Sequence, residues 1–452
     1  MRKVDWHVIP WLALLYLLNF LDRGNVGNAK LYGLEKDLGI TDRQYLIALT
    51  VFFFPYALLE PATNVLLRRL KPSYFLSFMI VSWGIIMTLH GVIHDYGGLV
   101  TCRVLLGLFE SGMYPGIVFY ISSWYKRTEL GSRVAVFFTS ATVAGAFSGL
   151  LASGIQNMHG IGGKPGWAWI FILEGLFTVI VGVFSLWVIQ DFPETAKFLN
   201  EEERAFIIRR LQSDQKISAS GEKFDAKYIW QSLKDWKTWV ASDDGPLFAF
   251  SLFTPTIINQ LGYTATIANL LSVPVYVWAC LVTLAIGFLG DRIGHRAYIN
   301  FGLFGTGLVG YIILIASRNA ALSYFAVYLA AAAWVAGNVE GAYKRGVTLA
   351  MAIGFGNLNG AVTSNVYRAT DAPWYPLGHG IVLAYIAIGF ISSAVFLIGL
   401  KRANASKERG VHDEIVHGVE NKHAHERNGT YASVEEARMD KGDRWSGFKY
   451  TY

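Results

Sequence analysis

The chain has 452 residues, of which 53% are hydrophobic and only 16% are charged, and its formal net charge is +6. This balance is too apolar for an ordinary soluble protein and predicts an integral membrane protein. Basic residues stand between apolar segments and form no single patch, so we expect them to set the orientation in the lipid bilayer and not to bind nucleic acid.

Twelve apolar segments follow one another when hydropathy is averaged over a window of about 19 residues. The first six lie at roughly 7–28, 45–67, 73–94, 98–121, 133–156 and 168–190. The second six lie at roughly 246–260, 267–289, 298–316, 322–339, 347–367 and 378–400. Six plus six spans around a polar stretch are typical of a transporter built from two similar bundles.

We therefore predict an all-α membrane protein of twelve transmembrane helices. Its expected parts are an N-terminal six-helix bundle (1–190), a cytoplasmic central loop (191–245), a C-terminal six-helix bundle (246–400) and a disordered cytoplasmic tail (401–452). The seventh and tenth apolar runs, Leu247 to Ile258 and Tyr324 to Val339, are shorter than the ~20 residues that cross a bilayer. Truncation of these spans would make the chain a non-functional product, which is one alternative.

Clusters of Lys and Arg alternate with nearly neutral loops between the predicted spans. Because basic loops stay in the cytoplasm, this pattern places both chain termini on the cytoplasmic side. We expect a monomer in the plasma membrane. In the central loop, Asn200 is followed by three glutamates, which predicts a short capped helix.

Four ionisable residues interrupt the apolar spans. Asp22 and Arg23 lie in the first span, and Arg103 and Glu110 lie seven residues apart in the fourth. Seven residues make about two helical turns, so the last two side chains share a face, and the cost of exposing a charge to lipid turns that face toward a polar cavity. The alternative is that the four residues merely neutralise one another as internal salt bridges.

Two further acids in the apolar spans, Glu60 and Glu174, are expected to be structural. Signatures of soluble enzymes are missing: the chain has no HExxH, GxSxG, CxxC or Walker motif. These absences predict a protein that is not an enzyme and that has neither a cofactor nor a metal site.

Residues 287–296 carry glycines and charges at the end of the eighth span. The glycines permit close helix packing, and the aspartate can pair with arginines as a breakable latch. The pattern resembles the G-x-x-x-D-R-x-G-x-R signature of the major facilitator superfamily, and with the twelve spans this resemblance covers nearly the whole chain except the tail. The expected gate consists of Gly287, Asp291, Arg292, Gly294 and Arg296.

Other stretches resemble the fungal allantoate permease group of organic anion symporters. They are Leu21 to Asn28, Arg103 to Gly116, Asp191 to Thr195, Val339 to Gly346 and Gly356 to Gly360. The sequences of these motifs are most similar to those of the high-affinity nicotinate transporters in this group.

This resemblance implies that Asp22 and Glu110 carry protons while Arg23 and Arg103 hold the substrate carboxylate. A tyrosine of the second span lines the site in related anion symporters, and Tyr56 occupies that place. The other candidate substrate ligands are Asn25, Asn28, Asn357 and Asn359. For the last two, hydrogen bonding between helices is an equal alternative.

The predicted function is proton-coupled uptake of a small organic anion such as nicotinate, allantoate or a related carboxylate vitamin. Loading the anion onto an arginine would free a neighbouring acid to take up a proton, so both would cross together. The stretch from Gly145 to Gly154 lacks the proline that antiporters of the superfamily often carry in the fifth span, which favours symport. A membrane nutrient sensor and a membrane-embedded hydrolase are the rival functions.

Overall fold

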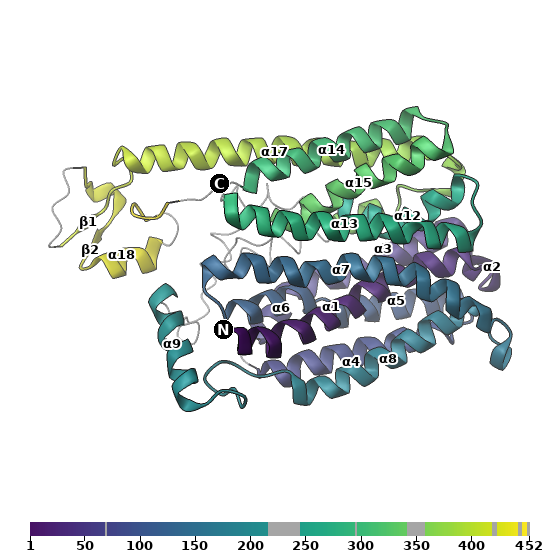
Figure 1. Cartoon of the computed structure of the whole chain (residues 1–452), viewed down its shortest axis with the longest axis horizontal. Coiled ribbons are helices and arrows are strands. Elements are labelled where there is room, and N and C mark those ends of the chain that lie inside the picture. The colour runs from purple at the N-terminus through teal and green to yellow at the C-terminus, as the bar shows by residue number, and fades with distance from the viewer. Residues whose placement is uncertain are drawn as a thin grey trace.

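The computed structural model describes residues 1–67, 70–215, 245–293, 296–340, 358–417, 423–441 and 445–449. Helices dominate these ranges (Figure 1). The first group is α1 (Arg2–Leu31), α2 (Leu34–Asp37), α3 (Asp42–Leu67), α4 (Pro72–His90), α5 (Tyr96–Glu110), α6 (Met113–Ser122), α7 (Arg127–Ile155) and α8 (Gly166–Val188). The second group is α12 (Gly245–Gln260), α13 (Ala265–Ile293), α14 (Arg296–Ala316), α15 (Ala320–Glu340) and α17 (Pro376–Glu408).

The two groups lie one above the other in Figure 1 and meet where α7 packs along α13 and α1 packs against α12. Within the first group α4 packs along α8 and α1 along α7, while α14 packs against α15 and α17 in the second. Glycines allow the backbones to touch. A Cβ on Gly175 of α8 would lie 2.4 Å from the Thr88 nitrogen of α4, and a Cβ on Gly149 of α7 would lie 2.6 Å from the Asn269 oxygen of α13.

Hydrogen bonds join the two groups at the end of the molecule that carries α2. Asn365 Nδ2 donates to Thr50 Oγ1 at 2.8 Å, and Asn269 Nδ2 donates to the Tyr32 hydroxyl at 3.1 Å. The Ala369 amide donates to Asp42 Oδ2 at 3.1 Å. The N-terminus and α9 (Glu201–Gln215) lie at the opposite end (Figure 1).

Most predicted spans coincide with long helices. In the described part of the chain, eight helical segments are long and apolar enough to cross a membrane, and they are α1, α4, α5 with α6, α7, α8, α13, α14 and α17. Helices α3, α12 and α15 stand at the second, seventh and tenth predicted positions. The eleventh predicted span lies mostly outside the described residues, which resume with a helical stretch at 358–363.

The tenth span is longer than its sequence suggested. Helix α15 has 21 residues, which at 1.5 Å per residue is about 31 Å, against a bilayer core of roughly 30 Å. The difference arises because α15 begins at Ala320, four residues before Tyr324, and ends at Glu340, one residue after Val339.

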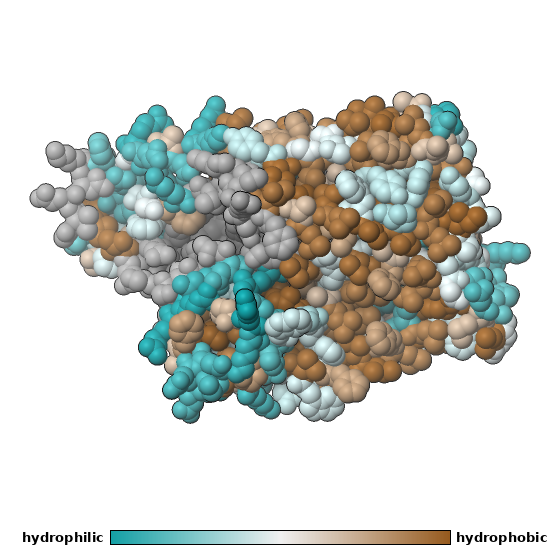
Figure 2. Space-filling model, viewed as in Figure 1, coloured by the Kyte–Doolittle hydropathy of each residue, from teal (hydrophilic) through white to brown (hydrophobic). Residues whose placement is uncertain are grey.

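Large apolar side chains cover the outside of the helices. Leu58 is 77% exposed, Trp187 is 70% exposed and Phe78 is 61% exposed. Figure 2 shows hydrophobic residues spread over the helical body, while hydrophilic residues gather at the end that carries α9. An apolar belt of this extent is expected where lipid, not water, surrounds the protein.

The predicted capped helix is α9. Asn200 Oδ1 accepts a hydrogen bond from the Glu203 amide at 2.8 Å, and Glu203 Oε2 accepts one from the Asn200 amide at 3.1 Å, which is a capping box. An exposed ion pair of 2.7 Å between Lys3 and Glu203 joins the start of α1 to α9.

The segment 401–452 contains regular structure, which differs from the expected disordered tail. Helix α17 continues to Glu408, β1 (Ile415–Val416) pairs in parallel with β2 (Thr430–Tyr431), and α18 (Val434–Lys441) follows. This segment has no apolar run, and polar contacts between side chains stabilise its structure instead. Glu414 is 4% exposed and accepts hydrogen bonds from Lys441 at 2.7 Å and Ser446 at 2.8 Å.

Candidate functional site

The four charged residues of the predicted site are buried inside the first helix group. Asp22 and Glu110 are each 1% exposed, Arg103 is 3% exposed, and the side chain of Arg23 is 11% exposed. Asp22 and Arg23 lie on α1, while Arg103 and Glu110 lie on α5. None of these groups faces lipid.

A break in the fourth predicted span positions Glu110. Helix α5 ends at this residue, Ser111 and Gly112 form a turn, and α6 begins at Met113. Gly112 sits against α3, because a Cβ there would lie 2.8 Å from the Thr63 Cβ atom. The turn therefore packs tightly, and the Glu110 carboxylate stands at a helix end.

Arg23 and Glu110 form an ion pair across the two helices. Arg23 Nε donates a short hydrogen bond to Glu110 Oε1. The guanidinium also lies over three aromatic rings, 5.1 Å from the centre of Tyr56, 5.4 Å from Phe20 and 5.7 Å from Phe52. Arg23 and Glu110 therefore form the internal salt bridge that was the alternative to a substrate site. Tyr56 lies against the Arg23 guanidinium and does not line either of the two cavities described below.

Arg103 has no such partner. Its Nε and Nη2 atoms are buried and have no hydrogen-bond acceptor among the described residues. A buried guanidinium without acceptors is costly, so the site favours an anion that supplies them.

Both arginines line one small cavity between the two helix groups. Its volume is about 20 Å³, which is room for about one water molecule. Three phenylalanines and two leucines form most of its wall. The lining residues are Phe20 and Arg23 of α1, Leu49, Phe52 and Phe53 of α3, Arg103 of α5, and Ser251 and Leu252 of α12.

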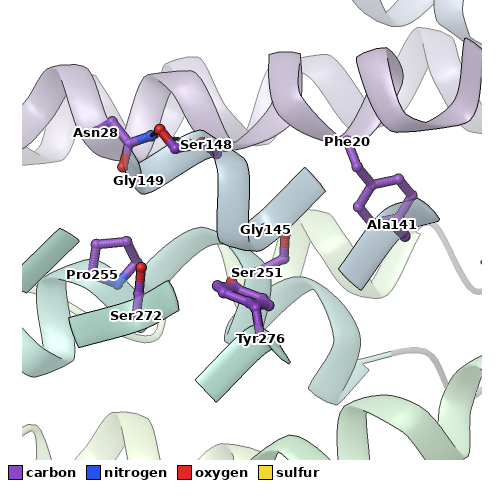
Figure 3. Close-up of a pocket in the computed structure, with 11 residues that line it drawn as sticks. Phe20, Asn28, Ala141, Gly145, Ser148, Gly149, Ser251, Pro255, Ser272 and Tyr276 are labelled. Carbon is purple, nitrogen blue, oxygen red and sulfur yellow. Dashed lines mark hydrogen bonds between the residues drawn. The ribbon is translucent and has the colours of Figure 1, made fainter. Parts of the chain in front are cut away.

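A second cavity of about 20 Å³ lies nearby and shares Phe20 and Ser251 with the first. Figure 3 shows residues of α1 and α7, among them Asn28 and Ser148, facing Pro255, Ser272 and Tyr276 of α12 and α13. Asn28 Nδ2 donates to Ser148 Oγ at 2.7 Å. This cavity therefore also lies between the two groups of helices.

Asp22 and Asn25 point to partners that the sequence did not reveal. Trp83 Nε1 of α4 donates to Asp22 Oδ2 at 2.6 Å, and Asn25 Nδ2 donates to Glu174 Oε2 of α8 at 2.8 Å. Neither Asp22 nor Asn25 lines the two cavities. Trp83 lies in an ordinary apolar span, so no sequence signal distinguishes it from a core residue.

Comparison with known proteins then decides the family. A sequence model described as the Major Facilitator Superfamily matches residues 12–397. The chain belongs to the Major Facilitator Superfamily. The MFS-type transporter cnsO of Penicillium expansum is 35% identical over 91% of this chain and 84% of its own length. The high-affinity nicotinic acid transporter of Saccharomyces cerevisiae is 31% identical over 90% of this chain and 79% of its own length.

Solved structures agree with this assignment at the level of the fold. A crystal structure of a bacterial homologue of the human lysosomal transporter Spinster, inward-facing and occupied, matches with a TM-score of 0.63 at 15% identity. The match covers 88% of this chain and 97% of that one. The protein is thus an all-α, multi-pass membrane protein with the major facilitator fold, and it is a transporter of the kind that moves small solutes.

The remaining candidate residues of this superfamily member are only partly described. Asn359 lies in the helical stretch 358–363, and Asn357 lies outside the described residues. Gly287, Asp291 and Arg292 belong to the last turns of α13, and Arg296 begins α14. Gly294 and the side chains of this motif lie outside what the structure describes, so the gate stays a prediction.

Proposed function

We propose that this transporter takes up a small organic anion together with a proton across the plasma membrane, as a monomer with both termini in the cytoplasm. The anion's carboxylate binds Arg103 and Arg23, and Asp22 and Glu110 are the proton-coupling acids. The two helix bundles rock against each other around this site.

The observation that carries the proposal is the state of Arg103. Two of its guanidinium nitrogens are buried without an acceptor, and the same cavity also receives Arg23. A carboxylate can accept two parallel hydrogen bonds from a guanidinium, which neither the phenylalanine nor the leucine side chains of the cavity can do. An organic anion is therefore the ligand that these residues favour.

The residues of the cavity wall favour a ligand with an aromatic ring over a ligand with a polar chain. Phe20, Phe52 and Phe53 offer apolar faces, and Ser251 supplies the one hydroxyl group among the lining residues. Allantoate carries two ureido groups that would lose water without gaining partners there. A flat ring bearing one carboxylate, such as nicotinate, fits this chemistry better, and the relative named as a nicotinic acid transporter supports the same choice. With about 20 Å³ of space, the ligand enters only after the bundles move apart.

Ion pairing supplies a mechanism for coupling. Arg23 is held by Glu110 in the structure. A substrate carboxylate that binds Arg23 competes with Glu110, and the added negative charge in a desolvated site favours protonation of one of the proton-coupling acids. Anion and proton would then cross together without net charge.

Transport assays in yeast that lacks its own transporters test the function. The cells would express this protein and receive radiolabelled nicotinate or allantoate, with or without a protonophore. We expect nicotinate uptake to exceed allantoate uptake and to fall at least tenfold with the protonophore. Uptake that the protonophore leaves unchanged would exclude proton coupling, and specific binding without uptake would favour the sensor.

The substitution Arg103→Ala tests the site itself. Removing one partner of a buried charged contact costs about 2–5 kcal/mol, so nicotinate uptake should fall at least about 30-fold at equal membrane abundance. Arg103→Lys keeps the charge without the planar fork and should retain part of the uptake. Arg318→Ala, at an exposed arginine beside Trp374, is the control. Full uptake by Arg103→Ala would refute the assignment.

A further inference from the structure

Two buried acids, Asp22 of α1 and Glu174 of α8, share an unusual environment. Asp22 is 1% exposed and Glu174 is 7% exposed. Each accepts a hydrogen bond from a neutral donor, Trp83 for Asp22 and Asn25 for Glu174. The second oxygens, Asp22 Oδ1 and Glu174 Oε1, are buried and have no hydrogen-bond partner in the described part of the chain.

The two carboxyl groups are close neighbours along the contact between α1 and α8. Asn25, which donates to Glu174, follows Asp22 by three residues and is therefore about one helical turn away on the same side of α1. Helix α4 closes this region, because Gly175 of α8 packs against the backbone of Thr88.

The buried charges around this pair do not balance. Among the described residues around the site, Arg103 and the nearly buried Arg23 face three buried carboxyl groups, Asp22, Glu110 and Glu174. Arg23 is already paired with Glu110. Burying uncompensated carboxylates costs several kcal/mol each, and two carboxylates that share a site do not both remain ionised.

We propose that Asp22 and Glu174 hold one proton between them and that this is the transported proton. The inference rests on the proposed function and gives Glu174, expected from the sequence to be structural, a direct part in coupling. A proton from water forms an O–H bond on the orphan oxygen of one of the two carboxylates. The bond breaks when the proton returns to water on the other side.

Glu110 keeps its charge in this arrangement as long as it pairs with Arg23. The buried or nearly buried charged and titratable groups on the helices around this pair are Asp22 and Arg23 of α1, His90 of α4, Arg103 and Glu110 of α5, and Glu174 of α8. An anion bound at Arg103 would be repelled by two ionised acids nearby. Neutralising one of them removes this repulsion, so the anion and the proton favour each other's binding.

Two modes of transport separate a proton-holding residue from a structural one. Purified protein in liposomes would be given radiolabelled nicotinate, and two transport rates would be measured. The first is nicotinate accumulation driven by a pH gradient. The second is exchange of internal for external nicotinate, which needs no net proton movement. Glu174→Gln should lose at least tenfold in accumulation and keep exchange within about twofold of wild type. Glu174→Asp, which retains a titratable group, should keep part of the accumulation, and Glu203→Gln, at an acid of α9, is the control.

If Glu174→Gln does not reach the membrane, Glu174→Met tests the same point, because it replaces the carboxyl by an apolar group of similar length. Accumulation at the wild-type level, or an equal loss of accumulation and exchange, would overturn this inference. Wild-type protein that shows no proton-driven accumulation would instead overturn the proposed function. The two failures are therefore distinguishable.

Discussion

The ion pair between Arg23 and Glu110 makes the sharpest prediction about stability. Glu110→Gln keeps the shape of the side chain but removes its charge, which leaves the Arg23 guanidinium without a counter-charge. Both side chains are almost fully buried, with 11% and 1% exposure, so solvent compensates little. Breaking one partner of a buried pair costs about 3–5 kcal/mol. A change of 1 kcal/mol shifts the Tm of a domain of 150–250 residues by about 2–4 °C, so we expect a fall of roughly 6–20 °C.

Thermal unfolding of the purified protein in detergent measures this change. Arg23→Met should also lower the Tm, partly through the lost contacts with Tyr56 and Phe20. The double variant Arg23→Met/Glu110→Gln leaves neither charge behind, so its loss should be at least about 2 kcal/mol smaller than the sum of the two single losses. Additive losses, within about 0.5 kcal/mol, would show that the two groups do not stabilise each other.

Two further predictions concern packing and the cytoplasmic end. Gly149→Leu should prevent α7 from packing on α13 and reduce transport, because the new Cβ would lie 2.6 Å from the Asn269 backbone oxygen. Gly154→Leu on the same helix is the control, because a Cβ at Gly154 would have no neighbour within 4 Å. Transport is measured at equal expression, and equal activity of the two variants would argue against the close approach of α7 to α13. Burial raises the pKa of Glu414, but hydrogen bonds from Lys441 and Ser446 outweigh this and hold the pKa below its ordinary value of 4.5. The stabilisation is present above pH 4.5 and is lost as the pH falls through the lowered pKa. Glu414→Gln should therefore loosen β1 and α18 at pH 7, and its difference from the wild type should shrink as the pH falls through the lowered pKa. Distances between spin labels at Arg409 and Glu436 measure this change.

Local periodicity in the sequence was enough to predict most of the helices and the burial of the charged residues in α1 and α5. The seven-residue spacing of Arg103 and Glu110 correctly indicated that both would avoid lipid. It gave no information about the helix opposite, so it could not tell that Glu110 pairs with Arg23 while Arg103 keeps two free donors. The pairing of charged residues depends on which helices pack together, and the residue spacing within one helix does not reveal its neighbouring helices.

Similar limits apply to Glu174 and to the tail. Glu174 stands alone in an apolar span, and only the packing of α1 on α8 brings it near Asp22. The tail lacks an apolar run, so composition predicts disorder, yet a few polar contacts around Glu414 organise part of it. Long-range polar contacts are the feature that composition and periodicity miss.

The hydrogen bonds that join the two helix groups at the α2 end determine how readily this side can open. They join Thr50 to Asn365, Tyr32 to Asn269 and Asp42 to the Ala369 amide. At about 1 kcal/mol net each, three such bonds make the parted arrangement about a hundredfold rarer than the joined one. A solute reverses that ratio only if it binds the parted arrangement more than about a hundredfold more tightly than the joined one. The seal is therefore tight enough to limit leakage through an empty carrier and weak enough to yield during each turnover.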